Sequence, residues 1–286
     1  MLLKVVHRTC YHYSLPVYLE PFTVRLRPRC DATQSLRSYR IHVTPAPSGI
    51  AHCIGLDGNN TETIWFSDMH RALSIEVQTL VETHHGDAFN FLVTDPAALR
   101  LPVKYDSRLA PGLDHYLVRC GDDARVAAFA QEMMRAAKQE TIPFLTLLAE
   151  TIPKRFEYML REHGDPWTPE ETMKQGRGSC RDFAMLFIDI CRSAGIAARF
   201  VSGYCIGDVS ADSDMHAWAE VFLPGAGWRG FDPSRGLSTS DDYIAVAAGQ
   251  SPQDAAPTFG SFRGEAVSTL EAEISISLPD DADTIT

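Results

Sequence analysis

The sequence predicts an α+β protein, in which an antiparallel β-sandwich-like domain precedes a core made of a helix packed on an antiparallel sheet. The first hundred residues hold short β-branched or aromatic runs separated by Pro, Gly, Asn and Asp, without a convincing amphipathic helix. Helical periodicity begins only after residue 112, and strand-like segments return from residue 196 onward. Strands and helices segregated in this way are typical of α+β proteins.

Composition divides the chain into three predicted parts. Residues 1–105 form the β-rich domain, residues 106–250 form the core, and residues 251–286 form an extension with one long strand and an acidic tail. The alternating run 267–278 is predicted to join either the core sheet or the N-terminal domain, and the sequence leaves both open. The strands expected in the first domain are Leu3–Tyr13, Thr23–Arg27, Ser38–Val43, Thr61–Phe66 and Leu73–Glu82.

Helices are expected between residues 124 and 175. One covers 124–138, and 143–161 is predicted as two helical pieces that meet near Pro153, because proline disrupts a helix interior. Thr168 followed by Pro-Glu-Glu171 is a capping signal for a further helix.

Charge and cysteine usage exclude several classes of function. The 26 basic and 37 acidic residues give a net charge of −11, which argues against a nucleic-acid or anionic-membrane partner. No apolar run is as long as a membrane span, and the start becomes charged before a signal-peptide core could form, so we expect a cytoplasmic protein. The seven cysteines are odd in number and lack paired spacing, as expected of reduced thiols. No metal or cofactor motif is present, and we expect neither.

The segment Arg177-Gly-Ser-Cys-Arg-Asp182 is predicted to begin a helix that presents a nucleophile. Gly176 and Gly178 interrupt the preceding structure, and apolar residues then recur at helical spacing until Gly195. Ser179 is the expected N-cap and Asp182 its capping-box partner, which makes Cys180 the first helical residue. The positive end of the helix dipole favours the thiolate form of a cysteine there, and the Cys180 N–H could bind an oxyanion.

Residues 216–232 are predicted to form a β-hairpin that brings a histidine and a carboxylate together. His216 lies on an alternating run, turn-forming residues follow at 224–227, and Asp232 ends a short returning strand. The two side chains share a face only if Phe222 pairs with Trp228, which requires an odd number of residues in the turn or a bulge. A carboxylate bonded to the imidazole would then orient His216 as a base.

These motifs closely resemble those of the transglutaminase-like cysteine protease superfamily. The runs G-x-G-S-C-R-D-F-A, A-A-R-F-V-S-G-Y and H-A-W-A-E-V-F-L-P-G-A-G-W-x-G-F-D-P-S stand in family order, with Ser234 where the family usually has Thr. The resemblance implies a papain/transglutaminase-like core with Cys180 as nucleophile, His216 as general base and acid, and Asp232 as orienter. The opening residues 7–17 and the segment 25–29 also resemble the N-terminal β-domain that precedes this core in many bacterial relatives.

The resemblance implies a reaction class but leaves the substrate open. A thiolate that attacks an amide gives a thioester, which water resolves in a peptidase or amidase and an amine resolves in a transglutaminase. We favour hydrolysis of a peptide or protein amide; the alternatives are acyl transfer and a non-catalytic binding module that retains the fold. Gln175 and Tyr158 are candidate oxyanion donors beside the Cys180 N–H. The resemblance also implies a functional link to peptide-forming ATP-grasp ligases, whereas the oligomeric state stays open.

Overall fold

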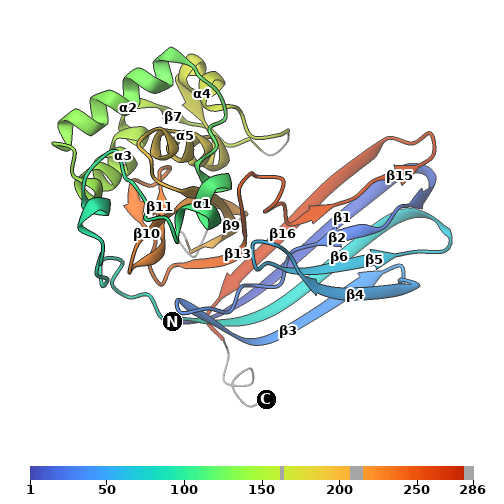
Figure 1. The fold of residues 1–286 in the computed structure, drawn as a ribbon. Coiled ribbons are helices and arrows are strands. Elements are labelled where there is room, and N and C mark those ends of the chain that lie inside the picture. The colour runs from blue at the N-terminus through green and yellow to red at the C-terminus, as the bar shows by residue number, and fades with distance from the viewer. Residues whose placement is uncertain (162–163, 207–214, 280–286) are drawn as a thin grey trace.

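The structure is a computed structural model that describes residues 1–161, 164–206 and 215–279. Its helices gather at one end around a short-stranded sheet, and long strands extend away from that end (Figure 1). The predicted α+β class is confirmed, with the strand-rich domain first in the chain and the helices after it.

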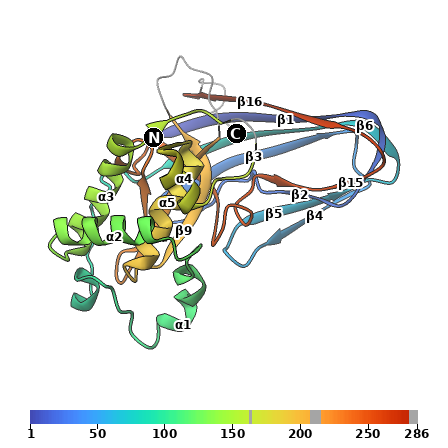
Figure 2. The same ribbon diagram turned by 90° about the horizontal axis from the view of Figure 1, so that it is seen from above.

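The strand-rich part is a sandwich of two antiparallel sheets, whose layers are seen edge-on in Figure 2. One sheet has the order β15-β1-β6-β3, with β16 also paired to β1, and the other has the order β14-β2-β5-β4. The strands from the first 83 residues are β1 (Leu2–Leu19), β2 (Phe22–Val24), β3 (Gln34–Thr44), β4 (Gly49–Ile54), β5 (Asn60–Trp65) and β6 (Met69–Thr83).

Alternation along the strands builds the core of this sandwich. In β6, Leu73, Ile75 and Val77 are buried between the sheets, while the residues between them are partly exposed. Buried apolar side chains at every second position are the pattern that the sequence displayed, so the sandwich prediction is confirmed. Strand β4 has no counterpart among the predicted strands, because most of its side chains are exposed and its pattern is weak.

The C-terminal segment completes the N-terminal sandwich. Strand β16 runs antiparallel to β1, from Tyr13 opposite Ser268 to Lys4 opposite Ser277, which settles the alternative that the sequence left open. The three predicted domain boundaries remain a proposal, with the C-terminal part joined to the first domain in space. The strands are β14 (Thr258–Phe259), β15 (Phe262–Arg263) and β16 (Ser268–Ser277).

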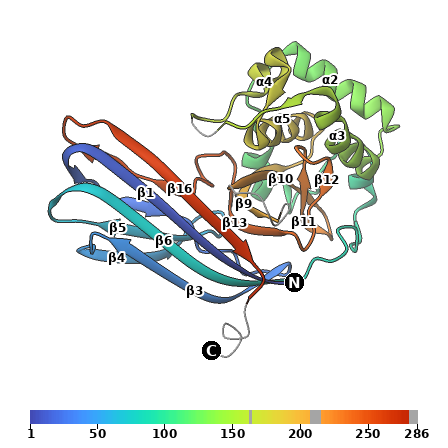
Figure 3. The same ribbon diagram turned by 180° about the vertical axis from the view of Figure 1, so that it is seen from behind.

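The second part is a five-stranded antiparallel sheet in the order β12-β11-β10-β9-β13, with helix α5 lying across one face (Figure 3). Helices α2, α3 and α4 pack around α5, which is buried along almost its whole length. The strands are β9 (Ala198–Cys205), β10 (His216–Leu223), β11 (Gly227–Asp232), β12 (Leu237–Ser238) and β13 (Tyr243–Gly249). The helices are α2 (Ala124–Ala136), α3 (Thr141–Arg155), α4 (Pro169–Gln175) and α5 (Cys180–Ser193).

Short elements connect these two parts or precede the helices of the core. Between the sandwich and the core lie η1 (Pro96–Leu99), α1 (Ala110–Leu113) and η2 (Asp114–Leu117). The two-residue strands β7 (Glu157–Tyr158) and β8 (Arg177–Gly178) form a parallel pair directly ahead of α5.

The prediction of two helical pieces meeting near Pro153 is wrong, because α3 is one helix from Thr141 to Arg155. Pro153 lies in the last turn of α3, two residues before the helix ends at Arg155. Its missing N–H therefore costs the helix one backbone hydrogen bond close to its C-terminus. The helix then ends where the Phe156 N–H donates to the Ile152 carbonyl.

Side-chain amides from the first domain cap the outer edge of β13. Gln34 donates to the Ala245 carbonyl and accepts from the Ala245 N–H, both at 2.8 Å. Asn59 does the same at Ala248, at 2.6 and 2.9 Å. Both amides are almost fully buried, so they satisfy backbone groups that an edge strand would otherwise leave unpaired inside the protein.

An apolar cluster also joins the two parts. Leu3 and Val5 of β1 pack with Tyr204, Ile244 and Val246 of the five-stranded sheet. The inward face of β1 therefore serves the sandwich at one end and this junction at the other. In the described part of the chain, no helix is both long and apolar enough to cross a membrane.

Candidate active site

Helix α5 begins as its sequence predicts. Ser179 is the N-cap of α5 and Cys180 is the first helical residue. Asp182 Oδ2 accepts from both the Ser179 N–H and its hydroxyl, each at 2.8 Å, which confirms the capping box. Cys180 is half-buried and lies at the N-terminus of a helix of 14 residues, the positive end of the helix dipole.

The β10–β11 hairpin has the register that brings a carboxylate back beside His216. Phe222 pairs with Trp228 and Leu223 pairs with Gly227, so three residues remain unpaired in the turn. The odd turn length is the predicted condition for a shared face. Gly225 in the turn and Gly227 after it have φ angles of +86° and +73°, a backbone region that glycine enters at little cost.

Cys180, His216 and Asp232 come together where α5 and the hairpin meet. His216 Nε2 lies 2.7 Å from Asp232 Oδ2, and Cys180 lies close enough to the imidazole to raise the pKa of His216. Because Nε2 faces Asp232, Nδ1 is the ring nitrogen available to the thiol. The sequence-predicted residues are thus one connected group of side chains.

Asp232 is fully buried and accepts hydrogen bonds from five described groups. Oδ1 accepts from the Ser234 N–H at 2.8 Å, the Ser234 hydroxyl at 2.6 Å and the Arg235 N–H at 3.2 Å. Oδ2 accepts from His216 and from the Tyr243 hydroxyl, the latter at 2.8 Å. Burial alone would raise the pKa of Asp232, but bonds from His216, Ser234 and Tyr243 lower it, so the residue is a carboxylate at neutral pH.

The pKa of His216 shows the strength of this pairing. Burial by itself would lower that pKa, yet hydrogen bonds and charge from Asp232 and Cys180 outweigh burial and raise it to about 10. The imidazolium form of His216 is therefore favoured at neutral pH. A protonated histidine next to a thiolate is the resting state of a cysteine nucleophile.

We expect the His216–Asp232 pair to make stability depend on pH. In the unfolded chain the pKa of histidine is about 6.5, so a raised pKa in the fold stabilises it fully below 6.5, and the gain is lost as the pH rises toward 10. Urea unfolding of Cys180→Ala and of Cys180→Ala/His216→Gln, from pH 6 to 10, isolates this contribution. The first variant should lose more stability across the range; equal losses in the two would contradict the pairing.

The two predicted oxyanion donors lie in different surroundings. Gln175 is in the last turn of α4, and its amide donates to Glu171 one turn earlier. Tyr158 pairs with Gly178 across β7 and β8, which places it beside the backbone two residues before Cys180, and its ring packs edge-on against Phe183. We keep both as candidates for the role, and the placement favours Tyr158.

Three contacts at the site were missed by the sequence reasoning. Tyr243, at the start of β13, donates to Asp232; a lone hydroxyl that opens the run Tyr-Ile-Ala-Val-Ala-Ala was the available hint. Arg161 forms two bonds of 2.7 and 2.8 Å with Asp182. Cys205 is half-buried against the apolar cluster around Trp218 and Tyr243, with its sulfur 2.6 Å from Arg235, and Cys191 is fully buried.

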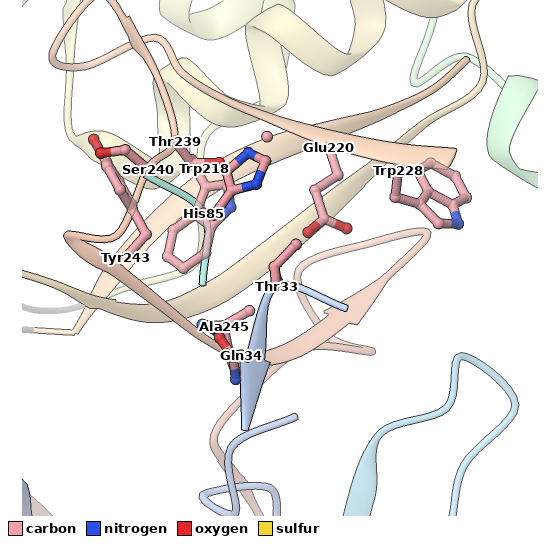
Figure 4. Close-up of a pocket in the computed structure, with 11 residues that line it drawn as sticks. Thr33, Gln34, His85, Trp218, Glu220, Trp228, Thr239, Ser240, Tyr243 and Ala245 are labelled. Atoms are coloured by element: carbon pink, nitrogen blue, oxygen red, sulfur yellow. Dashed lines mark hydrogen bonds between the residues drawn. The ribbon is translucent and has the colours of Figure 1, made fainter. Parts of the chain in front are cut away.

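A small polar pocket lies against the same sheet face as His216 (Figure 4). Its volume is about 40 Å³, and its walls include Trp218 and Tyr243 from the core and Gln34 and His85 from the first domain. This is room for water rather than for a peptide side chain. The polar loop 207–214, predicted to rim the cleft, lies outside the described residues. Among the described residues, no group of three or more His, Cys, Asp or Glu side chains could hold a metal ion.

Two sequence families match the chain in the order of its two parts. The bacterial transglutaminase-like N-terminal region matches residues 3–82, and the transglutaminase-like superfamily matches residues 127–233, which include all three clustered residues. The chain therefore carries a transglutaminase-like core, with the bacterial transglutaminase-like N-terminal region ahead of it. This confirms the resemblance seen in the sequence.

Individual relatives agree with this assignment. An uncharacterized protein of Mycobacterium leprae is 25% identical over 96% of this chain and 98% of its own length. The protein-glutamine gamma-glutamyltransferase of Pseudomonas aeruginosa is 29% identical over 38% of this chain and 18% of its own. The solved structure of a candidate cysteine protease from Cytophaga hutchinsonii has a TM-score of 0.72 at 22% identity, covering 98% of this chain and 92% of that one. At that identity the structural likeness shows the fold.

Proposed function

We propose that this protein is a cysteine-dependent amide hydrolase, a peptidase or amidase that acts through a thioester. The observation that carries the proposal is the bonded set of Cys180, His216 and Asp232 at the N-terminus of α5. Nucleophile, base and orienter in contact are the requirement for covalent acyl chemistry. A binding module that had lost catalysis would have no need to keep this arrangement.

In the proposed reaction, Cys180 and His216 act in both the acylation step and the deacylation step. The Cys180 thiolate forms a C–S bond with the substrate carbonyl carbon, and the C–N bond then breaks as His216 gives its proton to the leaving amine. Water next attacks the thioester while His216 takes a proton from it, and the C–S bond breaks to release the acid. The Cys180 N–H, with Tyr158 or Gln175, is the proposed donor to the oxyanion of both tetrahedral intermediates.

Acyl transfer to an amine is the second candidate, favoured by the 29% identity to the gamma-glutamyltransferase over 120 residues. Transfer and hydrolysis share every step up to the thioester and differ only in the acceptor. A screen of peptide amides with and without added primary amine, read by mass spectrometry, separates them. Acid products at all amine concentrations support hydrolysis; amide products that replace the acid as amine is added would make transfer the function.

The cytoplasmic location and the link to ATP-grasp ligases remain predictions.

We expect Cys180 to be alkylated by iodoacetamide at pH 6 at least about ten-fold faster than the other cysteines, since only an activated thiol is ionised there. The chain contains its own controls, because Cys30, Cys53 and Cys120 are exposed whereas Cys180 is half-buried. Peptide mapping after short reaction times measures all of them in one sample. Modification in order of exposure, with Cys180 behind the exposed cysteines, would contradict activation.

A further inference from the structure

Tyr243 is connected to the nucleophile through a continuous series of bonds. Its hydroxyl donates to Asp232 Oδ2 at 2.8 Å, the oxygen that accepts from His216 Nε2 at 2.7 Å, and His216 in turn contacts Cys180. Carboxylate oxygens accept hydrogen bonds over a broad range of directions near the carboxylate plane. The bonds from Ser234 and Arg235 hold only Oδ1, so they leave the orientation of Oδ2 less restricted. The second donor on Oδ2 fixes the oxygen that orients the imidazole.

The surroundings of Tyr243 hold its hydroxyl in place. Only 6% of the residue is exposed, and its ring packs edge-on against Trp218 with centroids 5.3 Å apart. Gly203 lies between, on β9 opposite His216, and a Cβ there would come within 2.6 Å of the Trp218 ring. The absence of a side chain at Gly203 thus lets the Trp218 ring sit beside β13, against the ring of Tyr243.

The first domain holds the strand that carries Tyr243. Gln34 pairs with both backbone groups of Ala245, and the Thr83 hydroxyl donates to the Asp241 carbonyl at 3.0 Å. The His85 N–H donates to the Asp241 side chain. These bonds fix the chain on both sides of Tyr243 to the sandwich.

We propose that Tyr243 is a positioning residue for the catalytic group, and that the N-terminal sandwich acts on catalysis by holding the start of β13. The inference rests on the proposed function, because it assigns Tyr243 a task only if His216 activates Cys180. Tyr243 orients Asp232, Asp232 orients His216, and His216 stabilises the Cys180 thiolate. Among the residues that the structure describes, the other titratable groups facing this network are Cys205 and Arg235.

The test is the pH profile of Cys180 alkylation by iodoacetamide in the full chain, read by peptide mapping so that Cys205 is measured separately. Tyr243→Phe removes one hydroxyl and keeps the ring. If His216 is less well oriented, the thiolate is less stabilised, so half-maximal alkylation should move to higher pH and the rate at pH 6 should fall about three- to ten-fold, the equivalent of one hydrogen bond. His216→Gln should move the profile further in the same direction.

Tyr204→Phe is the matched control. Tyr204 lies on the neighbouring strand β9, is also buried, and its hydroxyl is 2.9 Å from His7 Nδ1, away from Asp232. It should lose comparable stability and keep the wild-type alkylation profile. Melting curves of both variants accompany the measurement.

Each outcome decides a different claim. A profile shifted by His216→Gln but unchanged by Tyr243→Phe would overturn the role of Tyr243 and leave the proposed function standing. A profile unchanged by His216→Gln would overturn the proposed function itself. A Tyr243→Phe chain that fails to fold where Tyr204→Phe folds would also contradict the inference, because it would assign Tyr243 to stability alone.

Discussion

Replacing Cys180 with alanine should lower turnover by at least about a thousand-fold, because the other members of a catalytic group contribute little once the nucleophile is gone. The assay is cleavage of a peptide amide that the wild-type chain cleaves in the amine-free screen. The substitution removes a half-buried sulfur from the first residue of α5 and leaves the capping bonds between Ser179 and Asp182 intact, so the fold should persist. Circular dichroism and the melting temperature verify this.

Cys205→Ala is the sharpest control for that result. Cys205 is also half-buried, contacts Arg235 and lies close to His216, so it is the other thiol near the site. Burial raises the pKa of Cys205, which makes its thiol a poor nucleophile at neutral pH. The Cys205 variant should retain most activity. More than a few per cent of activity left in Cys180→Ala, or its loss in Cys205→Ala, would mean that the nucleophile has been misassigned.

The parts of the site that the sequence predicts are those governed by short spacings. The capping box depends on residues three apart, and the side-chain faces of the hairpin depend on the parity of positions on two strands joined by a tight turn. Cys180, His216 and Asp232 could therefore be placed from local rules together with the family motifs. The sandwich was equally visible, because alternation along a strand is a local pattern.

The parts that could not be predicted join residues with no regular spacing between them. Gln34 and Ala245 are 211 positions apart, and Asn59 and Ala248 are 189 apart. Nothing local marks such an amide as the partner of a distant edge strand. At Pro153 the rule that proline interrupts a helix gave the wrong prediction. Proline disrupts the interior of a helix, but Pro153 lies in the last turn of α3, where it is tolerated.

Asp182 illustrates how a residue predicted for one role is held by others. The sequence assigned it to the capping box, yet in the structure it is fully buried and also accepts two bonds from Arg161 and one of 2.7 Å from the Trp167 N–H. The Arg161 guanidinium lies over the Trp167 ring at 4.3 Å. The carboxylate therefore fixes the segment that precedes α4 against the start of the nucleophile helix.

Asp182→Ala should lower the free energy of unfolding by about 3–5 kcal/mol, because it leaves the nearly buried cation of Arg161 and the Ser179 N–H without this acceptor. Urea unfolding at pH 7 measures the loss. The matched control is Asp123→Ala, which removes the N-cap of α2, another helix-capping carboxylate but one that is much less enclosed, and should cost about 1 kcal/mol. Adding Arg161→Met to Asp182→Ala removes the unpaired cation and should restore part of the stability. A loss no larger than that of Asp123→Ala, or no recovery in the double variant, would show that Asp182 acts as a helix cap and that the buried ion pair adds nothing.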